Sequence, residues 1–215
     1  MIITIANEKG GSGKSTLCLN LCVQLLLDKK DIAALDTDSQ KSLEVFNNIR
    51  SETSLPNFTL FNRTGNITDT LKQMTDKYEY ILIDTKGEHS KESQRAMLLS
   101  DWVLIPTTPS QLDTAVLLDM LERIRDIQAL NENLKACIVM NRIRTFKEKK
   151  ALIDFINQNN ANESVFLMDN LLSERIAYKR SVSEGMGVME YNDNKAKNEW
   201  SQFYDELSGY LGGKK

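Results

Sequence analysis

A short stretch near the start of the chain, NEKGGSGKST at residues 7–16, combines three glycines with two lysines. Small residues let a backbone approach an anion closely, so the N–H groups of residues 10–15 can surround phosphate oxygens. In such a loop Lys14 neutralises the β and γ phosphates of a nucleotide, and the Ser15 hydroxyl takes one position around Mg²⁺. The stretch predicts a nucleotide-binding loop made of Gly10, Gly11, Ser12, Gly13, Lys14, Ser15 and Thr16.

Three aspartates each follow an apolar run. Asp36 and Asp38 come after IAAL, and Asp84 comes after YILI. If these runs are parallel strands, the aspartates lie at the carboxyl edge of the sheet, where open α/β sheets bind their ligands. An aspartate in that place can support a metal ion, or it can cap the next helix. The residue types leave both roles open.

Short aliphatic runs alternate with longer stretches of helical periodicity, which is typical of βαβ units. The fold class predicted is α/β, with a doubly wound, mostly parallel sheet flanked by helices, in a single domain over residues 1–215. We expect strands at 2–6, 32–36, 58–62, 80–84, 102–106, 136–140 and 164–168. We expect helices at about 14–28, 40–50, 66–76, 90–99, 112–129, 146–160 and 172–182, and a C-terminal helix at about 195–211 that packs on the domain.

Composition excludes several function classes. With 41% hydrophobic and 27% charged residues the chain is of ordinary globular type. A net charge of −3 argues against a protein that coats nucleic acid over its whole surface, although a local basic patch is compatible with it. The cysteines Cys18, Cys22 and Cys137 lie in apolar segments without disulfide-framework spacing, and no apolar run is long enough for a membrane span. We expect a cytoplasmic protein.

The glycine-rich loop departs from the general pattern G-x-x-x-x-G-K-[ST] at one position. The pattern requires a glycine at position 8, where this chain has Glu8. It matches K-G-G-x-G-K-[ST] and thereby resembles the deviant Walker A ATPases of the ParA/MinD family, in which Lys9 would be the signature lysine. The resemblance implies a Mg²⁺-dependent ATPase that forms an ATP-sandwich homodimer, with Lys9 reaching the phosphates bound by the other subunit. A second cation supplied only on dimerisation would couple hydrolysis to assembly.

The resemblance also assigns roles to the aspartates. Asp84 looks like the Walker B aspartate that holds Mg²⁺, Asp36 like a residue that supports the metal shell, and Asp38 like the residue that orients the attacking water. The catalytic residues implied are thus Lys9, Lys14 and Asp38, and the metal site is Ser15, Asp36 and Asp84. The segment DTKGEHS after the fourth strand differs from the family's usual continuation. Its histidine, His89, is expected to be a surface residue.

Two further segments resemble the family. LIPTTPSQLD at residues 104–113 is similar to small ParA proteins of the ParF type, where it would form a loop that faces the dimer partner. MNRIR at residues 140–144 resembles the sixth-strand ending, in which an asparagine reads the adenine edge, so Asn141 is a candidate for base recognition. A turn-forming asparagine explains this residue equally well.

Two basic clusters could touch DNA phosphates without reading bases, and each could equally be a solvated helix face. Their residues are Arg142, Arg144, Lys147, Lys149 and Lys150 in the first cluster, and Arg175, Lys179 and Arg180 in the second. The resemblance implies a nucleoid-associated partition ATPase that binds non-specific DNA and a centromere-binding ParB-like adaptor, and that can build assemblies beyond the dimer.

Alternatives remain within the same resemblance. A MinD-like ATPase that cycles on a membrane would carry a basic amphipathic C-terminal helix, whereas residues 195–211 are richer in acidic side chains. A DNA-transfer accessory ATPase of conjugation would use the same chemistry. A dethiobiotin-synthetase-like ligase would need a small-molecule pocket that the sequence does not reveal, and an iron protein would need cysteines in cluster-ligand loops.

Overall fold

A computed structural model describes residues 1–160 and 162–213. Within them eight parallel strands form one sheet in the order β3-β2-β4-β1-β5-β6-β7, with β8 pairing with β6. The strands are β1 (Ile2–Ile5), β2 (Ile32–Asp36), β3 (Thr59–Asn62), β4 (Tyr80–Asp84), β5 (Trp102–Thr107), β6 (Lys135–Ile143), β7 (Val165–Leu167) and β8 (Leu172–Ser173). The helices are α1 (Lys14–Leu27), α2 (Ser42–Ser51), α3 (Thr68–Thr75), α4 (Lys91–Leu98), α5 (Gln111–Gln128), α6 (Phe146–Asn159), α7 (Ile176–Ser183) and α8 (Asn194–Leu211).

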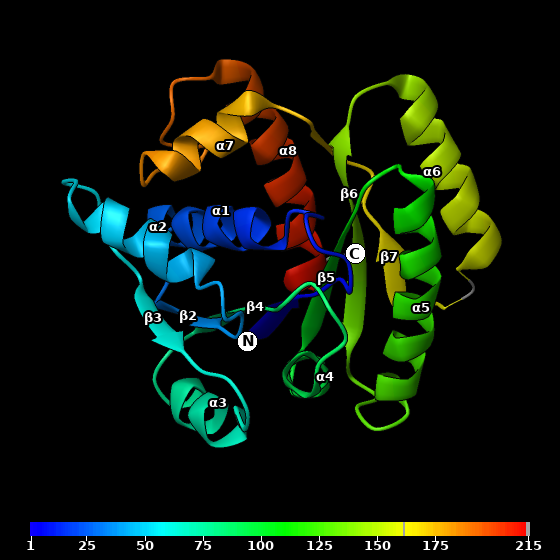
Figure 1. The fold of residues 1–215 in the computed structure, drawn as a ribbon, viewed down its shortest axis with the longest axis horizontal. Coiled ribbons are helices and arrows are strands. Elements are labelled where there is room, and N and C mark those ends of the chain that lie inside the picture. Colours follow the sequence, from blue (N-terminus) through cyan, green and yellow to red (C-terminus); the bar gives the residue numbers. More distant parts are fainter. Residues whose placement is uncertain (161, 214–215) are drawn as a thin grey trace.

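Helices cover the sheet on both faces, which confirms the doubly wound α/β prediction (Figure 1). One face carries α1, α2, α7 and α8, whose apolar side chains form a single core with β1 and β5. The other face carries α3 and α4 towards β2, and α5 and α6 towards β6. Strands β1, β2 and β5 are buried along their whole length, because a parallel sheet between two helix layers needs apolar side chains on both faces.

One expected element is wrong in part. The helix predicted at 172–182 begins only at Ile176, and Leu172 and Ser173 form β8 instead. The reason is that β6 continues to Ile143, three residues beyond its predicted end at 140, and thereby offers backbone groups that pair with β8. The C-terminal helix predicted at about 195–211 is present as α8, and its Trp200 is buried against the core.

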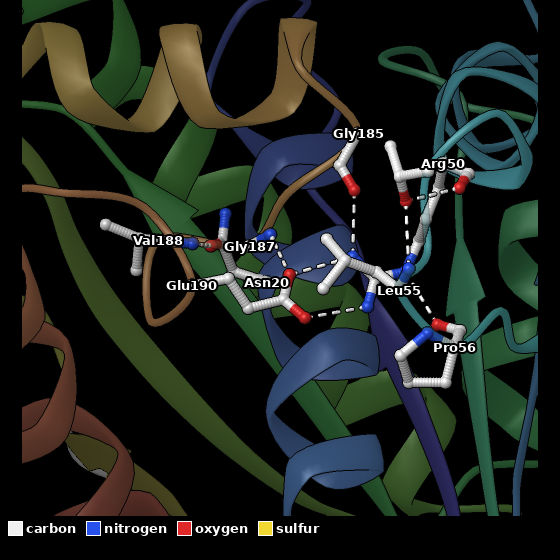
Figure 2. Close-up of polar contacts among 9 residues, drawn as sticks. Asn20, Arg50, Leu55, Pro56, Gly185, Gly187, Val188 and Glu190 are labelled. Atoms are coloured by element: carbon white, nitrogen blue, oxygen red, sulfur yellow. Dashed lines mark hydrogen bonds and ion pairs between the residues drawn. The ribbon is translucent and has the colours of Figure 1, made fainter.

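A buried ion pair joins α2 to the segment between α7 and α8 (Figure 2). Arg50 is fully buried, and its guanidinium donates two hydrogen bonds of 2.8 Å to the carboxylate of Glu190 and one to the carbonyl of Gly185. Close by, the side-chain oxygen of Asn20 in α1 accepts a hydrogen bond of 2.7 Å from the N–H of Val188. The helices that follow the glycine-rich loop and the Asp36–Asp38 loop are therefore fixed to one C-terminal segment.

Among the residues that the structure describes, no helix combines the length and the apolar character needed to cross a bilayer. The three cysteines are buried and free.

Candidate nucleotide-binding site

The glycine-rich loop lies between the central strand β1 and α1, at the carboxyl edge of the sheet. Gly11 and Gly13 have φ values of 79° and 97°, in the left-handed region that favours glycine. Asn7 anchors the loop because its side chain donates to the carbonyl of Pro106 and accepts from the N–H of Lys9, both at 2.9 Å. The first turn of α1 thus points its free N–H groups into a loop of small residues, which is an arrangement that binds phosphate.

The ammonium group of Lys14 lies inside this loop. Its Nζ donates a hydrogen bond of 3.0 Å to the carbonyl of Lys9, and the residue is only 6% exposed. Burial lowers the pKa of Lys14, while the negative charges of Asp84 and Asp38 oppose that shift. The predicted phosphate lysine is therefore directed towards two of the three predicted carboxylates.

Asp84 is fully buried at the end of β4, directly opposite Asp36 at the end of β2. Neither carboxylate oxygen of Asp84 has a hydrogen-bond partner of good geometry among the described residues. Burial raises the pKa of Asp84 to about 7, and the neighbouring Ser15 hydroxyl offsets part of this shift. A buried carboxylate with open lone pairs beside Ser15 and Lys14 fits a ligand that brings Mg²⁺.

The other two aspartates hold the loop between β2 and α2. The carboxylate of Asp36 accepts hydrogen bonds from the N–H groups of Asp38 at 2.9 Å and Leu43 at 3.1 Å. Asp36 is buried, whereas Asp38 is half-buried and its carboxylate accepts a hydrogen bond of 2.9 Å from the N–H of Gln40. Asp36 thus makes the helix-capping contacts that the sequence left open, and it fixes the backbone that presents Asp38.

The donor atoms near the loop suit a metal ion that arrives with a nucleotide and takes part of its ligands from the phosphates. In the described residues no three His, Cys, Asp or Glu side chains are grouped closely enough to hold a metal ion. Mg²⁺ usually keeps several waters and binds through one or two carboxylates together with substrate phosphates. The Asp84 carboxylate and the Ser15 hydroxyl are donors that would suit such a site.

Two of the cavities that border the loop meet at Gly13. The first, of about 400 Å³, is lined by Lys14, Ser15 and Asp38 together with residues 86–88. The second is narrower, about 40 Å³, and is lined by apolar and aromatic side chains that include Leu172, Tyr178 and Trp200, and also by Asn141 and Arg175. A polar cavity that continues into an apolar one suits a ligand with a phosphate chain and a ring.

Asn141 lines the second cavity and contacts the glycine-rich loop. Its amide nitrogen donates a hydrogen bond of 2.7 Å to the carbonyl of Ser12, and its amide oxygen accepts the N–H of Arg142 at 3.0 Å. Arg142 has a φ of 56°, so the chain turns sharply here. Asn141 therefore holds the phosphate loop and shapes the turn, and reading of the base by its amide stays a prediction.

Lys9 is turned away from Lys14 and towards α5. Its Nζ lies 2.9 Å from the carboxylate of Asp113 and 3.3 Å from the hydroxyl of Ser110. Although burial would raise the pKa of Asp113, hydrogen bonds from Ser110, Thr108 and Lys9 lower it overall. Ser110 and Asp113, at the start of α5, thus hold Lys9 within the same chain.

The predicted DNA-contacting residues differ in their surroundings. Arg144 forms an ion pair with Glu174, and Arg175 forms one with Glu199 at 3.0 Å, so nearby carboxylates neutralise both arginines. Arg142 lines both cavities at the loop, and Lys149 lines a shallow hollow beside α8. The exposed members of the two clusters are Arg144, Lys147, Lys150, Lys179 and Arg180, and of these Arg144 is paired with Glu174.

Sequence reasoning missed contacts made by the segment after Asp84. Lys86 and Glu88 line the phosphate cavity and form an ion pair of 2.6 Å. Glu8 forms an ion pair of 2.6 Å with Arg123 of α5 and lies 3.3 Å from the ring of His89. The unusual composition of DTKGEHS was the only signal that pointed to them.

A glycine-rich loop between a central parallel strand and a helix, beside an aspartate at the end of β4, defines a P-loop nucleoside triphosphatase fold. Residues 3–188 match the model of the CobQ/CobB/MinD/ParA nucleotide binding domain, so the chain belongs to that family of ATPases. "Protein ParA" of Rhizobium radiobacter is 27% identical over 147 residues, covering 66% of this chain and 64% of that relative. "Maintenance of carboxysome distribution protein A" of Halothiobacillus neapolitanus is 23% identical, covering 87% and 86%.

Solved structures share the fold. Apo McdA of Cyanothece has a TM-score of 0.73 at 18% identity, covering 96% of this chain and 98% of its own. The cell division ATPase MinD of Pyrococcus furiosus has a TM-score of 0.73 at 18% identity, covering 97% and 98%. A putative plasmid partition protein of Borrelia burgdorferi bound to AMPPNP has a TM-score of 0.69 at 23% identity, covering 99% and 98%.

Proposed function

We propose that this chain is a ParA-type ATPase that binds Mg²⁺-ATP, dimerises around it and hydrolyses it to ADP and phosphate. The observation that carries the proposal is Asp84, a fully buried carboxylate without a hydrogen-bond partner of good geometry among the described residues, next to the Ser15 hydroxyl and the Lys14 ammonium. Burying a charged carboxylate costs free energy unless a cation or a hydrogen-bond donor pairs with it. A magnesium ion carried by a nucleotide would do so.

In this proposal each residue has a separate task. Lys14 and the loop N–H groups bind the phosphates, while Ser15 and Asp84 hold Mg²⁺, which would supply charge neutralisation of the phosphates. Asp38, half-buried at the phosphate cavity, orients the attacking water, and Asp36 holds the backbone that presents it. The apolar cavity beyond Gly13 receives the base, with Asn141 at its entrance.

The dimer would form on the face that carries the loop. Three large apolar side chains near the starts of α5, α6 and α7 are exposed there, namely Leu112 at 74%, Phe146 at 80% and Ile176 at 62%. The helices begin at the carboxyl edge of the parallel strands that precede them, as the loop does (Figure 1). A second copy seated here would cover the apolar residues and bring its Lys9 to the phosphates.

The biological role proposed is DNA partition controlled by the nucleotide. Support comes from relatives named ParA and from the fold shared with a putative plasmid partition protein. The dimer would bind DNA non-specifically through the exposed Lys147, Lys150, Lys179 and Arg180, and a ParB-like adaptor would stimulate hydrolysis. Association with the nucleoid follows from such binding.

A different cargo is the second candidate. The relative named for carboxysome distribution matches 87% of this chain, so a protein cargo could replace a plasmid while the DNA-dependent cycle stays the same. The MinD-like and DNA-transfer roles would likewise keep the ATP cycle. Binding partners, rather than the ATP site, distinguish these roles.

Co-sedimentation tests the proposal directly. The protein is mixed with plasmid DNA or with anionic liposomes in the presence of ATP, ADP or no nucleotide, and Lys14→Ala serves as the variant that cannot bind phosphate. We expect DNA retention only with ATP, absent in Lys14→Ala and weakening steeply with salt. Retention on liposomes would favour the MinD-like role. Absence of ATP binding by the unmodified protein would refute the proposal as a whole.

A further inference from the structure

A second lysine borders the phosphate cavity besides Lys14. Lys86 comes two residues after Asp84, and its Nζ lies 2.6 Å from a carboxylate oxygen of Glu88. Both side chains line the same cavity as Lys14, Ser15 and Asp38. The Lys86 side chain is 40% exposed, so its ammonium can move without unpacking the core.

Gly87 holds this ion pair against the phosphate loop. A Cβ atom built on Gly87 would lie 2.8 Å from the Cα of Gly10 and 3.0 Å from the Nζ of Lys14. The backbone of residues 86–88 is therefore in contact with the loop and with the ammonium that binds the terminal phosphates. The long, flexible stem of Lys86 starts one residue away, which puts its ammonium within reach of a phosphate bound to Lys14.

The partner of Lys86 can be exchanged. Its ammonium is held by the carboxylate of Glu88, which is itself 58% exposed. The carboxylate of Asp38 lines the same cavity, as does the ammonium of Lys14. A terminal phosphate carries more charge than one carboxylate and offers several acceptor oxygens, so it can replace Glu88 as the partner.

We propose that Lys86 recognises the γ phosphate of the nucleotide in its own chain and releases Glu88 when ATP replaces ADP. The proposal rests on the proposed ATP-binding function and names the residue that distinguishes the two nucleotides. Lys86 therefore acts in cis, in contrast to the trans role proposed for Lys9. Release of Glu88 frees residues 86–88 to change their contact with the loop, so the state of the nucleotide is passed to this segment.

Nucleotide affinities measured by calorimetry test the proposal. Lys86→Ala, Lys86→Arg and Lys91→Ala are each titrated with Mg²⁺-AMPPNP and with Mg²⁺-ADP. Lys91 is an exposed lysine five residues further on, at the start of α4, and serves as the matched control. We expect Lys86→Ala to weaken AMPPNP binding about tenfold and ADP binding by less than about twofold, since only the γ phosphate loses a charged hydrogen bond. Lys86→Arg keeps most of the affinity, and Lys91→Ala behaves like the unmodified protein.

A second variant tests the exchange of partners. Glu88→Gln removes the competing carboxylate, so it should tighten AMPPNP binding several-fold and leave ADP binding unchanged. The titrations are run below the protein concentration at which light scattering detects dimers with AMPPNP. If Lys86→Ala weakens AMPPNP and ADP equally, or neither, Lys86 does not recognise the γ phosphate. If the unmodified protein binds neither nucleotide, the proposed ATPase function fails instead.

Discussion

Release of Lys9 from Asp113 should control how readily two chains associate. The Lys9 ammonium lies 2.9 Å from Asp113, whose side chain is 4% exposed, and it must leave this carboxylate before it can reach a phosphate on another chain. Asp113→Asn keeps the size of the side chain and its acceptor oxygen but removes the charge. The variant should therefore dimerise with ATP at a lower protein concentration than the unmodified chain.

The size of this effect follows from the exposure of the pair. A hydrogen bond to a charged group contributes about 1.5–3 kcal/mol, and the lower limit applies here because the Lys9 side chain is 30% exposed and solvent screens it. A loss of about 1.4 kcal/mol for each lysine changes the dissociation constant of the dimer by a factor of about ten. A symmetric dimer releases two lysines, so the dissociation constant of the dimer should fall by up to about a hundredfold.

Sedimentation velocity with Mg²⁺-AMPPNP over a series of protein concentrations measures this constant. Asp119→Asn, which removes an exposed charge from the same helix, is the matched control and should leave it unchanged. A thermal melt of Asp113→Asn checks that the loop contacts from Thr108 and Ser110 still hold. Dimerisation of Asp113→Asn at an unchanged or higher concentration would refute the idea that Asp113 holds Lys9 back.

Three other expectations concern stability and assembly. Burial raises the pKa of Asp84 from 3.8 to about 7, so between these pH values the folded state binds more protons than the unfolded state. The free energy of unfolding should therefore fall as pH rises through this range, by up to about 1.4 kcal/mol per pH unit. Urea titrations without nucleotide at several pH values should show a smaller fall in Asp84→Asn. Glu190→Gln leaves a fully buried guanidinium without its carboxylate and should lower the free energy of unfolding by about 3 kcal/mol, whereas Glu79→Gln, in an exposed pair, should have no measurable effect. Phe146→Ser should weaken ATP-dependent dimers without changing nucleotide binding by the monomer, and Leu130→Ser, 78% exposed beyond the end of α5, should not.

The fold was predictable because its strands are buried on both faces. Runs such as IAAL and YILI consist of aliphatic and aromatic residues, and each ends at an aspartate, so they identify strands without any tertiary information. The strand β8 escaped prediction because it has only two residues and exists through its pairing with the extended end of β6. Nothing in its local pattern separates it from the helix that follows.

The site was predictable where one motif holds its residues together. Lys14 and Ser15 follow from the loop pattern, and Asp84 follows from its place at a strand end. The pairing of Lys9 with Asp113 joins residues far apart in sequence, and Arg50 meets Glu190 across 140 positions. Contacts of that kind depend on how the helix and sheet layers pack, and no local sequence pattern predicts them.

The contact between Asn141 and Gly13 restricts how this chain can evolve. A Cβ atom at position 13 would lie 2.2 Å from the amide nitrogen of Asn141, so even alanine would displace the side chain that fastens the loop. The left-handed φ of Gly13 adds a second barrier to substitution. Glycine should therefore be retained at position 13 as long as Asn141 is present. A substitution at either position would require a compensating change at the other.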